Sequence, residues 1–176
     1  MDLKGYIRSI PDFPTRGIMF RDITTLLKDP HALREAVEAL SRPFRNERID
    51  QVVAAEARGF IFGPAVACQL GAGFVPVRKP GKLPAETIER TYELEYGADT
   101  LTIHRDAIRP ADRVLLLDDL LATGGTMKAC CDLVVELGAA VVACVFLIEL
   151  SFLPGRQKLA GYRVISLVDY ASEEEI

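Results

Sequence analysis

The chain has 176 residues and is 49% hydrophobic, which fits one domain with a sizeable core, because single domains commonly hold ~100–200 residues. Its formal net charge of -4 argues against a nucleic-acid-binding protein, whose affinity rests on clustered lysine and arginine. The amino terminus lacks the basic and apolar regions of a secretory signal, and the longest apolar run, residues 139–148, is shorter than the ~20 residues that a membrane span needs. We therefore expect a cytoplasmic protein that binds neither nucleic acid nor a membrane.

Its cysteines lie in apolar segments without CxxC spacing and are expected to be small buried core residues: Cys68, Cys130, Cys131 and Cys144.

The amino-terminal part of the chain predicts an irregular segment followed by a helix. Residues 9–17 are rich in proline and turn-forming residues, and a short apolar run, residues 18–20, comes after them. Asp29 and Pro30 form a helix-start signal, because an aspartate caps the first N–H groups and a proline suits the first turn. The apolar residues that follow recur with helical spacing and predict an amphipathic helix: Leu33, Ala36, Val37 and Leu40.

Two core strands are predicted in the next part of the chain, at residues 49–55 and 74–77, with a helix between them that ends at Gly71. Arg58 follows the carboxyl end of the first strand. Because ligands of open α/β sheets bind at that end, Arg58 is placed to meet an anion, with pairing to Glu56 as the alternative.

A basic loop and a polar arm come next. The loop at residues 78–84 carries three cations and two prolines, which would suit a diphosphate, with a solvated basic loop as the alternative. Residues 86–96 are polar, and the aromatic and apolar side chains of residues 92, 94 and 96 alternate with the glutamates at 93 and 95. Residues 97–99 are expected to form a turn, and residues 100–104 a returning strand. This pattern predicts an exposed hairpin that acts as a mobile lid. The cations of the loop are Arg78, Lys79 and Lys82.

The most informative stretch is residues 114–126. Four apolar residues run into Asp118 and Asp119, as in a buried parallel strand that reaches solvent at its carboxyl end. A glycine-rich loop, Ala122 to Thr126, then leads into a helix that stops at Gly138. Glycines let the backbone approach a ligand, and a helix start offers free N–H donors to an anion, so the loop suits a phosphate.

The same stretch also excludes some phosphate ligands and suggests another. It lacks the lysine of GxxxxGK[ST] and the pattern GxGxxG, which argues against a nucleoside triphosphate or NAD. Ionised Asp118 and Asp119 only accept hydrogen bonds and therefore suit sugar hydroxyls. A phosphate loop beside such acceptors is typical of a ribose 5-phosphate site, with an ordinary strand-to-helix turn as the alternative.

Further buried strands at residues 141–147 and 164–168, separated by a short helical piece, predict an α/β fold with a parallel sheet.

These thirteen residues resemble the motif by which type I phosphoribosyltransferases bind 5-phosphoribosyl 1-pyrophosphate (PRPP): four hydrophobic residues, two acids, a mixed stretch and Thr-Gly-Gly-Thr. With segments such as Pro11 to Pro14, Phe20 to Ile23 and the basic loop, the chain is similar to the adenine-using branch of this family from Ile7 to Tyr170. The resemblance implies one domain with a five-stranded parallel sheet and flanking helices. It further implies an amino-terminal hood at about residues 1–30, a core at about 31–176 with a flexible arm at about 79–104, and a homodimer.

The resemblance also implies a reaction of purine salvage. The phosphoribosyl group of PRPP is transferred to N9 of adenine, giving AMP and pyrophosphate, with Mg²⁺ held mainly by PRPP near Asp118 and Asp119. Glu95 and Arg58 are the implied catalytic residues. The residues implied to bind PRPP or AMP are Asp118, Asp119, Ala122, Thr123, Gly124, Gly125, Thr126, Arg58, Arg78, Lys79, Lys82 and Tyr96. Those implied to bind adenine are Met19, through its carbonyl, Arg21, through its N–H, and Phe20 and Leu120, through apolar contact.

Two alternatives remain open from the sequence. A phosphoribosyltransferase for 6-oxopurines would share the PRPP half of the site and differ in the base that it accepts. A regulator that senses PRPP without catalysis would use the same fold, although the chain has no helix-turn-helix extension or basic face to support it.

Overall fold

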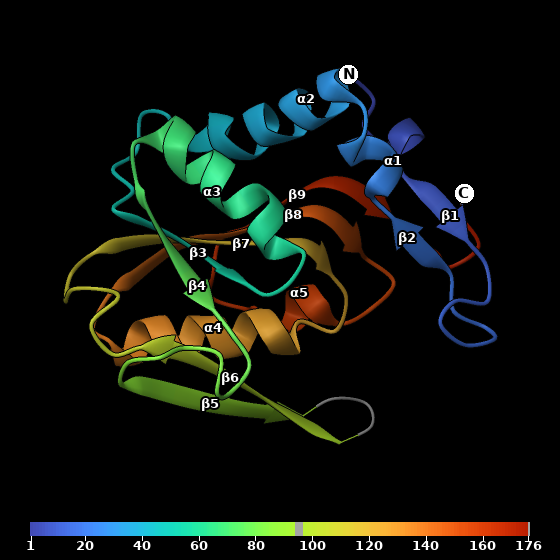
Figure 1. Cartoon of the computed structure of the whole chain (residues 1–176). Helices are drawn as coiled ribbons and strands as arrows, with labels where there is room; N and C mark the ends of the chain where they lie inside the picture. Colours follow the sequence, from blue (N-terminus) through green and yellow to red (C-terminus); the bar gives the residue numbers. More distant parts are fainter. Residues whose placement is uncertain (94–96, 176) are drawn as a thin grey trace.

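The computed structural model describes residues 1–93 and 97–175, and its centre is a five-stranded parallel sheet (Figure 1). The strands lie in the order β4-β3-β7-β8-β9, and every neighbouring pair is parallel. The three inner strands are largely buried on both faces, so their apolar runs are nearly unbroken, whereas the two edge strands are partly exposed. The five-stranded parallel sheet confirms the predicted fold class. The strands are β3 (Gln51–Ala55), β4 (Gly73–Val77), β7 (Arg113–Leu121), β8 (Ala140–Leu150) and β9 (Val164–Tyr170).

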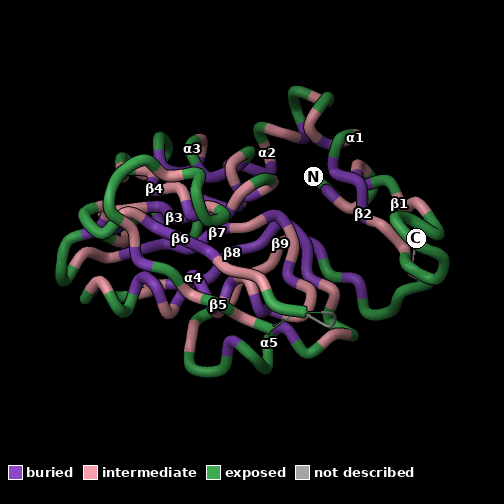
Figure 2. The backbone as a smooth tube through the Cα atoms, turned by 60° about the horizontal axis from the view of Figure 1, so that its bottom comes forward, coloured by how far each residue is buried: buried purple, intermediate pink, exposed green. Residues whose placement is uncertain are grey.

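The sheet divides the hydrophobic core into two layers, and helices cover both of them. On one face, α2 (Pro30–Ser41) and α3 (Gly59–Leu70) pack against the sheet, and on the other lies α4 (Gly125–Glu136) (Figure 1). Figure 2 shows the sheet strands as the mostly buried layer between them. The carboxylate of Asp29 caps α2 by accepting from two backbone N–H groups, as its sequence signal predicts. The shorter helical pieces are η1 (Lys4–Tyr6), α1 (Thr24–Leu27), η2 (Arg42–Phe44) and α5 (Gly155–Lys158).

A small antiparallel pair lies beside the β9 edge of the sheet, within the amino-terminal segment expected to be the hood (Figure 1). Strand β1 (Arg8–Ile10) pairs with β2 (Phe20–Asp22), and Arg8 forms an ion pair with Asp22 across them. The expected irregular segment over residues 9–17 is therefore wrong at its start. A three-residue strand is too short to leave a readable alternation in the sequence.

The arm is a hairpin of β5 (Thr87–Glu93) and β6 (Ala98–His104) that packs under α4 (Figure 1). Ile88, Leu101 and Ile103 are buried in the same apolar cluster as α4, so the base of the predicted lid belongs to the core. The predicted turn at residues 97–99 is wrong, since β6 already begins at Ala98. Glu95 and Tyr96 lie outside the described residues.

Two further expectations differ from the structure. Strand β7 does not end at the acid pair but continues through it to Leu121, because β8 extends beside it and supplies partners as far as Glu149. Cys68 is exposed on α3, whereas the other three cysteines are buried as expected. Among the described residues, none of the helices is both long and apolar enough to cross a bilayer.

Candidate active site

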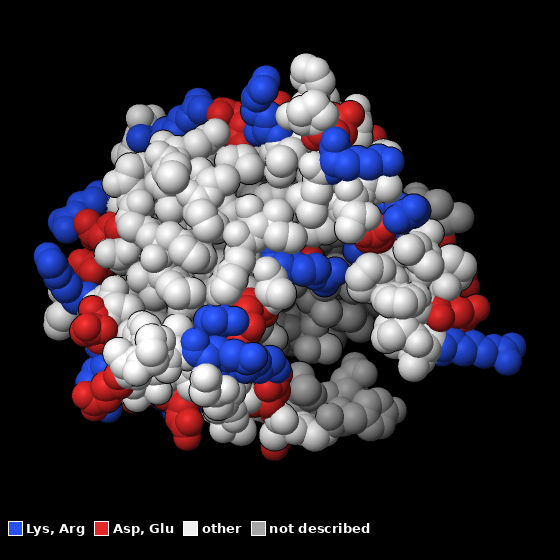
Figure 3. Space-filling view, in the orientation of Figure 1, with Lys and Arg blue, Asp and Glu red and all other residues white. Residues whose placement is uncertain are grey.

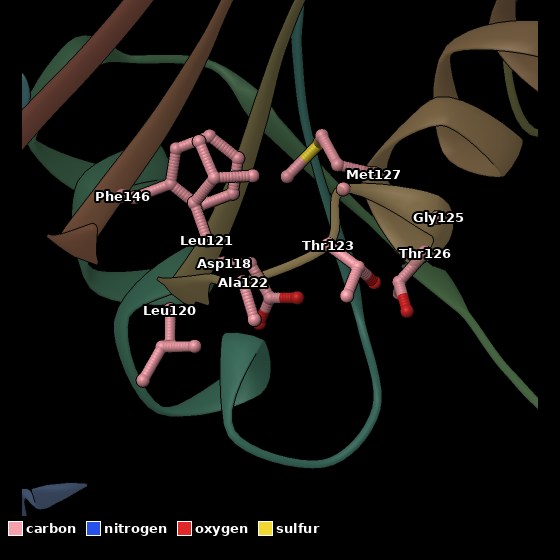
Figure 4. A pocket seen from close by; sticks show the side chains of 10 residues that line it. Asp118, Leu120, Leu121, Ala122, Thr123, Gly125, Thr126, Met127 and Phe146 are labelled. Atoms are coloured by element: carbon pink, nitrogen blue, oxygen red, sulfur yellow. The ribbon is translucent and has the colours of Figure 1, made fainter. Parts of the chain in front are cut away.

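The glycine-rich segment Ala122–Thr126, called the phosphate loop below, forms a pocket at the start of α4. The pocket has a volume of about 90 Å³ and is also lined by Asp118, Leu120 and Phe146. Gly124 is the residue before the helix and has φ +78°, a backbone conformation that side chains other than glycine rarely adopt. Figure 4 shows the Asp118 carboxylate beside the loop that carries the Thr123 and Thr126 hydroxyls. The first N–H groups of α4 have no partner within the helix, so the pocket combines several donors for an anion.

Helix α5 supports the phosphate loop from behind. A Cβ atom on Gly124 would lie 2.7 Å from the carbonyl oxygen of Gly155, and one on Gly155 would collide with the carbonyl oxygen of Ala122. The two backbones therefore touch directly. Arg156 holds α5 on the sheet because its Nε lies 2.8 Å from the buried carboxylate of Glu149. The salt bridge with Arg156 lowers the pKa of Glu149, which favours its ionised form.

The acid pair lies at the carboxyl end of β7, between the phosphate loop and α3. Consecutive strand residues point to opposite faces. Asp118 lines the phosphate pocket, while Asp119 is 4% exposed and lies with Oδ2 2.9 Å from Nε of Arg58. The Oδ1 atom of Asp118 accepts a 2.9 Å hydrogen bond from the Asp119 N–H.

The electrostatics of the pair favour a bound donor or cation. Burial, together with the neighbouring Asp119 charge, raises the pKa of Asp118 well above its usual range. Burial also raises the pKa of Asp119, although the Arg58 guanidinium opposes the shift. Among the described residues, none donates a hydrogen bond to Oδ2 of Asp119, because its contact with Arg58 is a charge contact without aligned geometry. This buried oxygen is therefore an acceptor in need of a partner.

Arg58 connects this acid pair with the hood. It precedes α3 at the end of β3, and its guanidinium carbon lies 5.4 Å from the centre of the Phe20 ring. The alternative that Arg58 pairs with Glu56 is wrong, since Glu56 contacts the basic loop instead. A Cβ atom on Gly59 would lie 3.0 Å from Oδ1 of Asp118, so a glycine at this position leaves room for the acid.

The basic loop is partly neutralised by acids of neighbouring elements. Arg78 lies 3.2 Å from the Glu56 carboxylate, which also accepts from the Lys79 backbone N–H. These contacts lower the pKa of Glu56. The Lys79 ammonium forms an ion pair with Asp99 at the start of β6. The loop is thus tied to β3 and to the arm rather than to the acid pair.

Tyr92 on β5 links the arm to the phosphate loop, and sequence reasoning missed it. Its hydroxyl lies 3.1 Å from the Thr126 hydroxyl and donates to Asp99 over 3.2 Å. A Cβ atom on Gly125 would lie 3.0 Å from the Tyr92 ring. In the sequence, the alternation in this segment predicted that Tyr92 lies on a strand. It did not predict which residue the Tyr92 side chain contacts.

The segment expected to bind the base, Met19–Phe20–Arg21, lies in the hood and is called the base segment below. The Phe20 ring packs edge-on against Phe13 at 5.0 Å and lines an apolar cavity of about 520 Å³, together with Ile23, Arg58 and other residues. The Arg21 side chain is 2% exposed and points into the protein. The structure therefore brings the base segment, Arg58, the acid pair and the phosphate loop into one region.

Comparisons with known proteins show the family to which the chain belongs. The model of the phosphoribosyl transferase domain family matches residues 22–172. The chain is 57% identical over 168 residues to the adenine phosphoribosyltransferase of Koribacter versatilis, covering 96% of this chain and 92% of the relative. The crystal structure of the Thermoanaerobacter pseudethanolicus adenine phosphoribosyltransferase has a TM-score of 0.93 at 54% identity and covers 96% of this chain and 98% of the other. The Saccharomyces cerevisiae enzyme, complexed with adenine and an imino-altritol bisphosphate, has a TM-score of 0.89 at 41% identity and covers 94% and 96% of the two chains.

Proposed function

Since the chain belongs to the adenine phosphoribosyltransferase family, we propose that the acid pair and the phosphate loop bind PRPP for the reaction of that family. The chain transfers the phosphoribosyl group of PRPP to N9 of adenine and releases AMP and pyrophosphate. The observation that carries the assignment of the site is the acid pair, in which Asp119 is buried and Asp118 partly buried, beside a helix start with a left-handed glycine. One end of the pocket offers donors to the 5′-phosphate, and the other offers acceptors to the ribose hydroxyls.

The reaction requires that C1′ lose pyrophosphate as N9 approaches. The bond from C1′ to the pyrophosphate oxygen breaks, its electron pair leaves with pyrophosphate, and N9 forms the new bond and loses its proton. Positive charge develops on the ribose ring in the transition state, and carboxylates near the hydroxyls stabilise it. Arg58 lies 2.9 Å from Asp119 and faces the Phe20 ring, which supports a position between the leaving group and the base in this proposal. We assign Arg58 a catalytic role on this placement.

Mg²⁺ is part of the proposal, and the residues present fit an ion carried by the substrate. The described residues contain no cluster of three or more histidine, cysteine or acidic side chains that would hold a metal alone. The unpartnered Asp119 oxygen and the Asp118 carboxylate would accept hydrogen bonds from waters on such an ion. When bound, Mg²⁺ supplies positive charge to the pyrophosphate oxygens. The protein adds fixed cations to the same anion, in our proposal Arg58, Arg78, Lys79 and Lys82.

For the base, we propose backbone recognition by the hood. Adenine presents an amino donor at position 6, so a site that prefers it must offer an acceptor. The Met19 carbonyl would accept from that amino group and the Arg21 N–H would donate to N7, while Phe20 and Leu120 supply apolar contact. Glu95 would manage the N9 proton or position the arm, with Tyr96 beside it. Replacing Glu95 by Gln should lower kcat more than it raises either KM, and an unchanged kcat would remove it from the chemistry.

We also propose that the protein is a cytoplasmic homodimer of single-domain subunits, each with the hood, core and arm described above. Helix α3 carries no charged residue, yet Ile61 is 40% exposed on it and Pro64 and Cys68 are exposed as well. A helix that is apolar on all sides is normally covered. Figure 3 shows a nearly uncharged face over α3 and β4. Sedimentation equilibrium should give a dimer for the unmodified protein and a monomer for Ile61→Glu, and a monomeric unmodified protein would contradict the proposal.

One assay separates the proposed function from its alternatives. Purified protein with PRPP and Mg²⁺ is offered adenine, hypoxanthine or guanine, and AMP, IMP, GMP and pyrophosphate are measured. We expect AMP with a preference of up to ~10⁴-fold, because a site that hydrogen-bonds one base leaves its polar groups unpaired with another. A preference for IMP or GMP would indicate a 6-oxopurine enzyme. Tight PRPP binding without pyrophosphate release on addition of adenine would indicate a regulator.

A further inference from the structure

The end of β9 and the segment after it, residues 171–175, called the tail, lie against the hood. Figures 1 and 2 both place the carboxyl terminus beside β1. Tyr170, the last residue of β9, is fully buried, and the guanidinium carbon of Arg21 lies 3.8 Å from the centre of its ring. The Lys4 ammonium lies 4.4 Å from the same ring. A buried aromatic ring with a cation at this distance is a favourable contact because the ring face is electron-rich.

The tail also holds both ends of the base segment by hydrogen bonds. The Arg21 guanidinium donates to the backbone carbonyl of Glu173 over 3.0 Å and to the Ser9 hydroxyl over 2.5 Å. At the other end, the Glu173 carboxylate accepts from the Met19 backbone N–H over 3.3 Å. The base segment is thus attached to β9 and the tail through its first and last residues.

We propose that Tyr170 and Glu173 are positioning residues for adenine, which they orient by fixing the base segment. This inference rests on the proposed function, in which the backbone of Met19 and Arg21 reads the base. A pair of three-residue strands has little stability of its own, so its backbone groups need an external support. Recognition through backbone atoms requires that those atoms be held within about 0.5 Å of the productive geometry. Neither Tyr170 nor Glu173 is assigned a contact with adenine.

The structure supplies matched control variants. The Tyr170 hydroxyl makes no hydrogen bond to a described residue, so Tyr170→Phe keeps the ring and should change nothing, whereas Tyr170→Leu removes the stack on Arg21. Similarly, Glu173→Gln keeps an acceptor for the Met19 N–H, whereas Glu173→Ala removes it. Because Tyr170 is buried and Tyr170→Leu could fail to fold, the exposed Glu173 gives an independent test.

The experiment measures KM for adenine and for PRPP, together with hydrogen exchange of residues 18–22 by mass spectrometry. We expect KM for adenine to rise about tenfold in Tyr170→Leu, equivalent to about 1.4 kcal/mol, and about threefold in Glu173→Ala. KM for PRPP should stay within about twofold, since the phosphate loop is untouched. Exchange at residues 18–22 should increase in the same two variants and not in Tyr170→Phe or Glu173→Gln.

Two results would overturn the inference, and they differ in meaning. Unchanged exchange in both Tyr170→Leu and Glu173→Ala would show that these residues do not hold the base segment. Increased exchange with an unchanged KM for adenine would show that the segment is held by them but does not read the base, which would also refute that part of the proposed function. Absence of AMP formation by the unmodified protein would refute the proposed function and with it the role in adenine binding, whereas the exchange data would still show whether the two residues hold the base segment.

Discussion

Replacing Gly124 by Ala tests the phosphate loop most directly. The backbone of Gly124 has φ +78°, and a residue with a Cβ atom loses roughly 1–2 kcal/mol in that conformation. The added Cβ atom would also lie 2.7 Å from the Gly155 carbonyl oxygen and 3.1 Å from its Cα atom, which belong to backbone and cannot rotate away. Helix α5 is held on the sheet by Arg156, so the loop itself must shift. Loss of one charge-assisted hydrogen bond to the phosphate, about 1.5–3 kcal/mol, would then raise KM for PRPP by about 10- to 100-fold.

The assay is initial-rate AMP formation at saturating adenine, with Tm measured in parallel. Gly161 provides the matched control. It has φ +94°, and apart from its two chain neighbours no heavy atom of the described residues lies within 4 Å of an added Cβ atom. Gly161→Ala should therefore lower Tm through backbone strain while KM for PRPP stays unchanged. If Gly124→Ala keeps KM for PRPP within about twofold of the unmodified enzyme, the phosphate is not bound at this loop.

Three further predictions concern the acid pair and the arm. Asp119→Ala should raise KM for PRPP by up to ~100-fold, since a charge-assisted bond contributes ~1.5–3 kcal/mol, and an unchanged KM would contradict the ribose assignment. Burial raises the pKa of Asp118 in the folded state, so its contribution to stability is full below the unfolded pKa and is lost as pH rises through the folded pKa. Asp118→Asn should accordingly raise Tm more at pH 8 than at pH 4 without ligand, and an equal change at both pH values would show that the carboxyl is not perturbed. Tyr92→Phe removes the hydroxyl contact with Thr126. If the Thr126 hydroxyl leaves Tyr92 to bind the 5′-phosphate, as we propose, the variant should lower KM for PRPP by about 2- to 10-fold, because such a contact is worth about 0.5–1.5 kcal/mol. A higher KM would instead mean that the Tyr92 hydroxyl binds PRPP.

Local patterns in the sequence predicted the sheet and the glycine-rich turn before α4 well. Strands β3, β7 and β8 are largely covered on both faces, and this burial appears directly as runs of apolar residues. The loop was predictable because glycines that precede a helix let an anion approach its first N–H groups. The same local reasoning placed the end of β7 too early, since it could not know that β8 continues beside the acid pair.

Contacts between distant parts of the chain were not predictable from these patterns. The alternation in the arm looked like an exposed hairpin because the face that carries Ile88 could equally have met solvent or a helix. Arg21 meets Tyr170, and Tyr92 meets Thr126, only because the fold brings separate elements together. No periodicity marks such a partner in advance. An arginine or tyrosine in a polar segment carries no sign of whether it faces water or a buried ring.

The direct backbone contact between Gly124 and Gly155 has a consequence for the order in which the substrates enter. Because the loop packs directly against α5, it is preorganised before a ligand binds. Phosphate binding therefore costs little conformational entropy of the loop. Among the described residues that line the phosphate pocket, none comes from the hood. The sugar phosphate can therefore dock first on a surface that is ready for it, and the purine can follow into a cavity that already has one reactant in place.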